Sequence, residues 1–252
     1  MREKLYSRQA VRECLRARRR QFFQLWLLKG IAESEIVSEI LSLARQLSVP
    51  IRYISRNQMD ALVENPGHQG IVLETSKYRY SSMDAMLSLA QDQEEAPLLL
   101  LLDLVQDVRN LGSLLRTAEA AGVHGVIVQE RRAASITPAV VNTSSGAVEH
   151  LLVAQVTNLS RAIEDLKSKD VWIAGLEYAE GAQLYTEIDL TGPLGVVVGS
   201  EGSGLRRLVR DHCDWLLMLP MRGAINSLNA AVAGSIALYE VLRQRGCCQS
   251  LD

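Results

Sequence analysis

Hydrophobic and polar positions follow a regular rhythm in the second part of the chain. Near-continuous apolar runs of strand length recur at 98–105, 123–128, 151–156, 171–176, 194–198 and 215–219. Stretches with helix-like spacing of apolar residues lie between several of them, at 111–121, 159–167, 205–211 and 227–243. Strands without polar alternation, separated by helices, predict an α/β fold with a parallel sheet covered on both faces. In such sheets, ligands bind at the carboxyl ends of the strands.

The first part of the chain predicts a smaller α/β unit. Its helix candidates lie around 11–15 and 34–47, and its strand candidates at 22–28, 51–54 and 71–73. A polar, acidic stretch at 77–96, with a helical turn near 83–89, is typical of a linker. We therefore predict a small domain at 1–76, a linker at 77–96 and a large domain at 97–252.

Composition excludes several classes of protein. Hydrophobic residues make up 48% of the chain and charged residues 22%, as in ordinary globular domains, and 5% aromatics argue against a protein that binds single strands mainly by stacking. Cys14, Cys213 and the vicinal pair Cys247 and Cys248 lack disulfide or C-x-x-C spacing, which indicates a reducing compartment. Without a secretory signal or an apolar run of spanning length, we expect a soluble cytoplasmic protein.

Charge is distributed unevenly. Residues 1–30 hold nine Lys or Arg against two Glu, a net charge of +7, so the remainder carries −9. A basic segment on an acidic body suits attraction to a phosphate backbone, although a solvated helix face has the same composition.

Three loops that follow strand candidates carry the chemistry. In the first, 107–123, Asn110 occupies the position of a helix N-cap, and Arg116 lies six residues later among apolar and small neighbours. A guanidinium in such surroundings needs a carboxylate, a phosphate or a helix end as partner. The alternative is a structural pair with Glu119 or Glu201.

The second loop, 196–205, runs from a strand through a glycine-rich turn into a helix. Glycines allow close approach of a backbone to a ligand, and the helix start offers amide donors. The spacing is not that of a dinucleotide fingerprint, and the carboxylate of Glu201 at its centre would repel a pyrophosphate, which disfavours NAD.

The third loop, 217–233, leaves a strand at Pro220 and enters a helix rich in small residues. Asn226 or Ser227 could be nothing more than an N-cap, which is the commonest use of such residues, whereas Asn229, one turn into the expected helix, has less structural reason to be there. Small residues at 230, 231, 233 and 234 would allow close packing against another backbone.

Together the three segments resemble the three motifs of the SpoU (TrmH-like) branch of the SPOUT methyltransferases. The matching patterns are N-x-G-x-x-x-R-T-A from Asn110, G-x-E-G-x-G from Gly199 and P-M-x-G-x-x-x-S-L-N from Pro220. The resemblance covers 97–245. Residues 6–20 and 68–71 also resemble the small L30e-like substrate-binding domain of ribosomal RNA methyltransferases of this family.

The resemblance implies a SPOUT domain with a deep trefoil knot, an exception to the rule that chains stay unknotted, and an L30e-like domain before it. It implies S-adenosylmethionine as the cofactor and a homodimer. Because the sequence has no His/Cys cluster with metal-ligand spacing and no apolar run of spanning length, we expect no metal and no membrane partner. The cofactor-binding residues implied by the motifs are Gly199, Glu201, Gly202, Leu219, Met221, Ser227 and Leu228.

The implied catalytic residues are Asn110, Arg116, Glu201, Ser227 and Asn229. Arg116 would activate the ribose hydroxyl or hold the adjacent RNA phosphate, since an arginine does not readily act as a base. Glu201 would orient Arg116 or the RNA, the two asparagines would hold the ribose and the loops, and Ser227 would support the last turn. In this context the basic cluster Arg18, Arg19 and Arg20 becomes a candidate RNA contact.

The function implied is methylation of a ribose 2'-hydroxyl in structured RNA, above all at a guanosine of 23S ribosomal RNA. Transfer RNA is the alternative substrate, because family members that act on it carry nearly the same motifs. A silent RNA-binding or ribosome-assembly protein on the same scaffold is the alternative from another class, and a nucleotide-dependent oxidoreductase lacks its fingerprint. We expect His124, His150 and His212 to pack or cap, and His68 to contact RNA or to support a turn.

Overall fold

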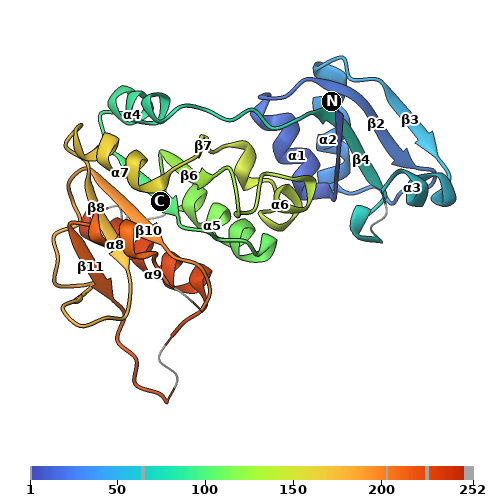
Figure 1. The fold of residues 1–252 in the computed structure, drawn as a ribbon. Coiled ribbons are helices and arrows are strands. Elements are labelled where there is room, and N and C mark those ends of the chain that lie inside the picture. The colour runs from blue at the N-terminus through green and yellow to red at the C-terminus, as the bar shows by residue number, and fades with distance from the viewer. Residues whose placement is uncertain (1, 64–65, 203, 225–226, 247–252) are drawn as a thin grey trace. The chain divides into compact units, whose positions relative to one another are not determined.

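The computed structural model describes residues 2–63, 66–202, 204–224 and 227–246. Asn226 and the pair Cys247 and Cys248 therefore lie outside the described residues. The chain forms two compact units, Met1–Arg79 with Ile136–His150, and Tyr80–Ser135 with Leu151–Asp252 (Figure 1). Among the described residues, no helix has the length and apolar character needed to cross a membrane.

The first unit is built on a mixed sheet of four strands in the order β1-β4-β2-β3. Its strands are β1 Arg2–Tyr6, β2 Phe22–Leu28, β3 Ile51–Ile54 and β4 Ile71–Ser76. Strands β1 and β2 each pair antiparallel with β4, and β2 pairs parallel with β3. Its α-helices are α1 Arg8–Ala17, α2 Glu35–Gln46, α3 Arg56–Leu62 and α6 Pro138–Thr143, with 3-10 turns η1 Pro66–His68 and η2 Ala147–Glu149.

Helix α1 shows why these residues fold locally as they do. Val11 and Leu15, four residues apart, are fully buried with Ala10 and Cys14 on the same stripe, while arginines occupy much of the opposite face. Because this stripe repeats with the period of a helix, it faces the core while the arginines remain solvated.

Residues 136–150 belong to the first unit because they pack closely on α1. A Cβ atom at Gly146 would lie 2.6 Å from Glu13 Cβ and 3.2 Å from Ala10 Cα, and Gly146 has a φ of +87°. Only glycine fits such an approach without strain. The grouping by contacts thus differs from the division expected from the sequence, which assigned this segment to 97–252.

The second unit contains a sheet of seven strands in the order β7-β6-β5-β10-β8-β11-β9. These strands are β5 Leu98–Leu102, β6 Gly125–Gln129, β7 Val153–Val156, β8 Trp172–Leu176, β9 Gln183–Leu184, β10 Leu194–Val198 and β11 Trp215–Met218. Each neighbouring pair is parallel. The predicted α/β class with a parallel sheet is confirmed.

Helices cover both faces of this sheet, as the apolar runs predicted. The helices of the unit are α4 Met83–Asp92, α5 Val108–Ala120, α7 Leu159–Lys167, α8 Arg207–Asp211 and α9 Ala230–Gln244. Leu99 and Leu101 of β5 pack in one cluster with residues of α4, α7 and α8. Helices α5 and α9 meet at the opposite face, where a Cβ atom at Gly234 would lie 2.6 Å from Leu114 Cδ2 and 3.0 Å from Val198 Cγ2.

Candidate active site

A cavity of about 540 Å³ opens at the carboxyl ends of three neighbouring strands, β10, β8 and β11. Its size lies within the range of small-molecule sites, and its place is the one expected for ligands of parallel sheets. The loops after the three strands and the first turn of α9 line it. All seven residues that the motifs implied for the cofactor lie in this wall: Gly199, Glu201, Gly202, Leu219, Met221, Ser227 and Leu228.

The loop after β10 folds tightly back on itself. Ser200 and Gly204 exchange two backbone hydrogen bonds, of 3.2 and 3.1 Å. A Cβ atom at Gly199 would lie 2.4 Å from the carbonyl carbon of Gly204 and 2.7 Å from the nitrogen of Leu205. Gly202 and Gly204 adopt φ values of +83° and +64°, which side-chain-bearing residues rarely adopt. The glycines therefore bring bare backbone to the cavity wall.

Asp103 anchors the far end of this loop, and sequence reasoning missed it. Its carboxylate is buried and accepts hydrogen bonds from the backbone nitrogen of Arg206 at 2.8 Å and from Arg206 Nε at 2.7 Å. The Arg206 Nη2 also donates to Gln129 Oε1 at 3.1 Å. The sequence did contain a signal for Asp103. It is the first charged residue after the fully apolar β5 and so lies at the carboxyl edge of the sheet.

Asn229 is the N-cap of α9 and joins it to α5. Its Oδ1 accepts hydrogen bonds from the nitrogens of Ala231 and Val232 at 2.9 and 3.3 Å, and its Nδ2 donates to Asn110 Oδ1 at 3.0 Å. The alternative that Ser227 serves only as the N-cap of this helix is wrong, because the helix begins three residues later, at Ala230, with Asn229 as its N-cap.

Asn110 is likewise not the N-cap of α5. Asp107 takes that role, accepting a hydrogen bond from Arg109 N at 2.6 Å, so the helix begins two residues before Asn110. The side chain of Asn110, which is buried, is thereby left to receive Asn229. The first residue of the first motif and the last residue of the third motif are thus in direct contact.

Helices α5 and α9 continue this contact along their length. Thr117 Oγ1 and Ser235 Oγ lie 2.8 Å apart, and Gly234 admits Leu114 at a distance that a larger residue would block. Gly234 therefore allows close packing, but against the side chains of Leu114 and Val198 and not against another backbone as predicted.

Arg116 lies six residues beyond Asn110 on α5 and is exposed. It does not belong to the described wall of the cavity, whereas Glu201, also exposed, does. At the start of α5, the hydrogen bond with Asp107 raises the pKa of Arg109, and the charge of Glu201 adds to this effect. The same hydrogen bond lowers the pKa of Asp107. Arg109 and Asp107 lie outside the described wall of the cavity, so their ion pair places a charged arginine near Glu201 and not in the cavity itself.

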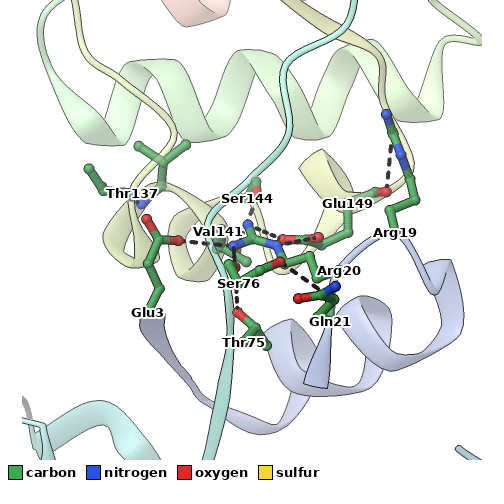
Figure 2. A network of polar contacts seen from close by, with 11 residues as sticks. Glu3, Arg19, Arg20, Gln21, Thr75, Ser76, Thr137, Val141, Ser144 and Glu149 are labelled. Atoms are coloured by element: carbon green, nitrogen blue, oxygen red, sulfur yellow. Dashed lines mark hydrogen bonds and ion pairs between the residues drawn. The ribbon is translucent and has the colours of Figure 1, made fainter. Parts of the chain in front are cut away.

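The basic cluster of the first unit is only partly available to a ligand (Figure 2). The side chain of Arg20 is 1% exposed and forms a bidentate contact with Glu149, with Nη2 to Oε1 at 2.6 Å and Nε to Oε2 at 2.9 Å. Its Nη1 donates to Glu3 Oε2 at 2.9 Å and to the carbonyl of Ser76 at 3.1 Å. Arg20, predicted as an RNA contact, therefore cannot offer its charge to a phosphate in this fold. Arg18 is exposed, and Arg19 is half-buried with Nη1 3.5 Å from the carbonyl of Glu149.

The histidines and cysteines have structural surroundings. His68 is buried, accepts a hydrogen bond from Gly70 N and lies 2.9 Å from Asp60, which is a turn role. Burial lowers the pKa of His124 and raises the pKa of the Cys213 thiol to about 12. The thiol of Cys14, also buried, has its pKa raised well above its usual range. Within the part of the chain that the structure describes, no cluster of His, Cys, Asp and Glu could hold a metal ion.

Comparison with known proteins gives two family matches. The model of the SpoU rRNA Methylase family matches residues 97–239, and the model described as RNA 2'-O ribose methyltransferase substrate binding matches residues 5–81.

Curated relatives match over nearly the whole chain. A protein named 23S rRNA (guanosine-2'-O-)-methyltransferase RlmB from Pseudomonas putida is 41% identical over 243 residues, covering 96% of this chain and 97% of that one. A protein named putative TrmH family tRNA/rRNA methyltransferase YacO from Bacillus subtilis is 38% identical over 239 residues, covering 95% and 94%.

Solved structures share the fold. The SpoU methyltransferase AviRb from Streptomyces viridochromogenes, in complex with AdoMet, superimposes with a TM-score of 0.80 at 23% identity, covering 98% of this chain and 91% of that chain. An AdoMet-bound rRNA methyltransferase from Sinorhizobium meliloti gives a TM-score of 0.80 at 22% identity, covering 99% and 88%.

Proposed function

Because the chain belongs to the SpoU rRNA methylase family, we propose that it transfers the methyl group of S-adenosylmethionine to the 2'-hydroxyl of a guanosine in 23S ribosomal RNA. The relatives named RlmB, 41–42% identical over 96% of this chain, support this substrate. The observation that carries the proposal is the cavity at the ends of β8, β10 and β11, whose wall brings together residues of the second and third motifs. The cytoplasm, where ribosomal RNA is found, is the compartment that fits this activity.

The residues of the cavity fit the cofactor. At Gly199 the wall is bare backbone, which can approach an adenine or a ribose closely. Leu219 and Leu228 supply apolar surface on either side of the third loop, with Met221 and Ser227 next to them. We assign these residues, with Glu201 and Gly202, to cofactor binding. When bound, S-adenosylmethionine supplies an activated methyl group on a sulfonium.

The protein's own contribution is positioning and charge. Methyl transfer is an in-line displacement, so alignment of the hydroxyl supplies much of the rate enhancement. The hydroxyl must lose its proton as it attacks, and a cation nearby stabilises the developing negative charge. We assign this role to Arg116, either at the hydroxyl or at the neighbouring phosphate. Glu201 orients it, and the contact between Asn110 and Asn229 holds α5 and α9 in register around the ribose.

The finer architecture is also part of the proposal. We assign the seven-stranded unit to the SPOUT fold with a trefoil knot and residues 1–76 to an L30e-like domain that recognises RNA. Val232 and Tyr239 of α9 are 48% and 53% exposed and lie seven residues apart, on one face of the helix. This apolar face supports assembly as a homodimer, since exposed apolar surface of this kind is typical of interfaces.

Of the three arginines of the first unit predicted to contact RNA, we assign this role to Arg18 and Arg19, because Arg20 is buried in an ion pair. Neutralising both with glutamine should reduce the salt dependence of RNA binding, because fewer counterions are released. A salt slope equal to that of the unchanged protein would contradict this contact.

The proposed activity is tested by incubating the purified protein with radiolabelled S-adenosylmethionine and unmodified total RNA, followed by nuclease mapping of labelled riboses. We expect label at a guanosine of 23S RNA. Label in transfer RNA would instead support the alternative substrate, and cofactor binding without transfer would support the silent scaffold.

A matched pair of variants tests the role of Arg116. Arg116→Ala should reduce transfer about 100-fold or more, as loss of electrostatic stabilisation does in other enzymes, while cofactor binding stays unchanged. Arg161→Ala on α7, an exposed arginine on the helix layer that packs against the opposite face of the sheet, should retain full transfer. Full activity of Arg116→Ala would refute the assignment.

A further inference from the structure

The carboxylate of Glu177 is an unexplained group in the cavity. Glu177 is the first residue after β8, lines the cavity and has a side chain that is 16% exposed. Its Oε1 accepts a hydrogen bond from Arg210 Nη1 at 3.2 Å. Its Oε2 is buried and has no hydrogen-bond partner among the described residues. One half of this carboxylate is therefore satisfied by the protein and the other half is not.

A buried carboxylate oxygen without a donor is costly, because it gives up its hydration without replacement. The described wall of the cavity offers no lysine or arginine, and its charged members are Glu177 and Glu201. Glu201, in contrast, is exposed to solvent. Because Glu177 lines the cavity, a molecule that fills the cavity can supply the missing donor for Glu177 Oε2.

The ion pair with Arg210 indicates which kind of donor suits Glu177 Oε2. The guanidinium of Arg210 already balances the negative charge of Glu177, so the remaining need is for a hydrogen bond and not for a second positive charge. The neutral hydroxyls of a ribose meet this need, and a carboxylate that accepts from a ribose hydroxyl is a recurring device of nucleotide sites.

We propose that Glu177 positions the cofactor by accepting a hydrogen bond from a hydroxyl of its ribose through Oε2. This inference rests on the proposed function, because it takes S-adenosylmethionine as the occupant of the cavity. It adds a positioning residue that lies outside the three sequence motifs. Because the contact is made to the ribose, it holds substrate and product cofactor alike.

Titration calorimetry on the full chain tests the assignment with S-adenosylmethionine and S-adenosylhomocysteine. Glu177→Ala should weaken both ligands by about ten-fold, the loss expected for one charge-assisted hydrogen bond. Glu177→Gln, which keeps an acceptor oxygen, should lose less. Glu180→Gln, an exposed glutamate outside the described cavity wall, is the matched control and should bind as the unchanged protein does.

The hydroxyl itself is tested with 2'-deoxy and 3'-deoxy analogues of S-adenosylhomocysteine. One of the two should bind the unchanged protein about ten-fold more weakly than the parent compound, and this difference should vanish in Glu177→Ala. The proposal is overturned if the variant binds both cofactors normally, if the deoxy penalty persists in it, or if it weakens S-adenosylmethionine far more than S-adenosylhomocysteine, which would indicate pairing with the sulfonium. An unchanged protein that binds neither cofactor would instead refute the proposed function, and this inference with it.

Discussion

Replacing Arg20 with methionine should strongly destabilise the first unit. The substitution keeps most of the side-chain volume but removes the guanidinium from between Glu149 and Glu3. Glu149, whose side chain is 1% exposed, would then be a buried carboxylate without a counter-charge. Two neighbouring acceptors, Glu3 Oε2 and the carbonyl of Ser76, would lose their donor as well.

The magnitude follows from this burial. Removing one partner of a buried ion pair typically costs about 3–5 kcal/mol, most of it the penalty of the charge left behind. For a domain of 60–100 residues, each kcal/mol lowers the melting temperature by about 4–8 °C. We therefore expect the first unit of Arg20→Met to melt at least about 12 °C below that of the unchanged protein.

Hydrogen exchange followed by mass spectrometry is the suitable assay, because it reports on peptides of the first unit separately from those of the second. Arg18→Met is the matched control, since its arginine is exposed and close in sequence. The double variant Arg20→Met with Glu149→Met removes the stranded carboxylate of Glu149 and should recover much of the lost stability.

Two results would refute this reasoning. A loss below about 1 kcal/mol, the range of exposed ion pairs, would mean that the contact is solvated in solution. A double variant less stable than Arg20→Met alone would mean that packing around the guanidinium, and not the unpaired charge, dominates.

Three further predictions concern the second unit. Gly199→Ala should weaken cofactor binding at least ten-fold in calorimetry, because the added Cβ atom collides with the backbone of the loop after β10. In Gly192→Ala the added Cβ atom meets nothing within 4 Å, so this variant should bind the cofactor normally. Equal affinity of the two variants would contradict a close approach of the Gly199 backbone to the cofactor. Asn229→Ala should cost about 1 kcal/mol of stability as a lost N-cap and abolish transfer in the label assay; intact transfer would exclude a role in the site. The hydrogen bond with Glu164 raises the pKa of His212, so the stability that this contact adds is complete below about pH 6.5 and is lost as the pH rises through the raised pKa of the folded state. The melting temperature of His212→Gln should therefore be lower than that of the unchanged protein at pH 5.5 and equal to it at pH 9. A difference in melting temperature that does not change with pH would refute this linkage.

Much of the fold could be predicted because the signals were local. Strands β2, β3 and β10 coincide with the strand candidates at 22–28, 51–54 and 194–198. For β10 the reason is plain, because a strand buried along its whole length requires a continuous apolar run. Strand β1 was missed because three of its five residues are charged. Strand β9 was missed because a strand of two residues is too short to show an alternation of apolar and polar positions. The cavity was placed correctly because ends of parallel strands share an edge.

What could not be predicted depends on partners that are distant in sequence. Arg20 looks like part of a solvated basic run, and the carboxylate that binds it in a bidentate contact lies 129 residues later. Asn229 looked misplaced as a cap because the local pattern offered an earlier polar residue, and the contact with Asn110 lies 119 residues away. Glu177 follows β8 but belongs to no sequence motif. Only its place in the cavity wall and its buried, unpaired Oε2 distinguish it from other carboxylates.

The interrupted sequence of the first unit has a consequence for synthesis on the ribosome. Residues 2–79 leave the ribosome well before 136–150, so Arg20 has Glu3 as a partner early, whereas its bidentate partner Glu149 arrives only later. At a synthesis rate of about 5–20 residues per second, the early segment waits several seconds with Arg20 paired to only one of its two carboxylate partners. A stalled or fragment chain that stops before residue 149 would therefore remain loosely folded and open to proteases, so that an incomplete enzyme is removed before it can occupy RNA.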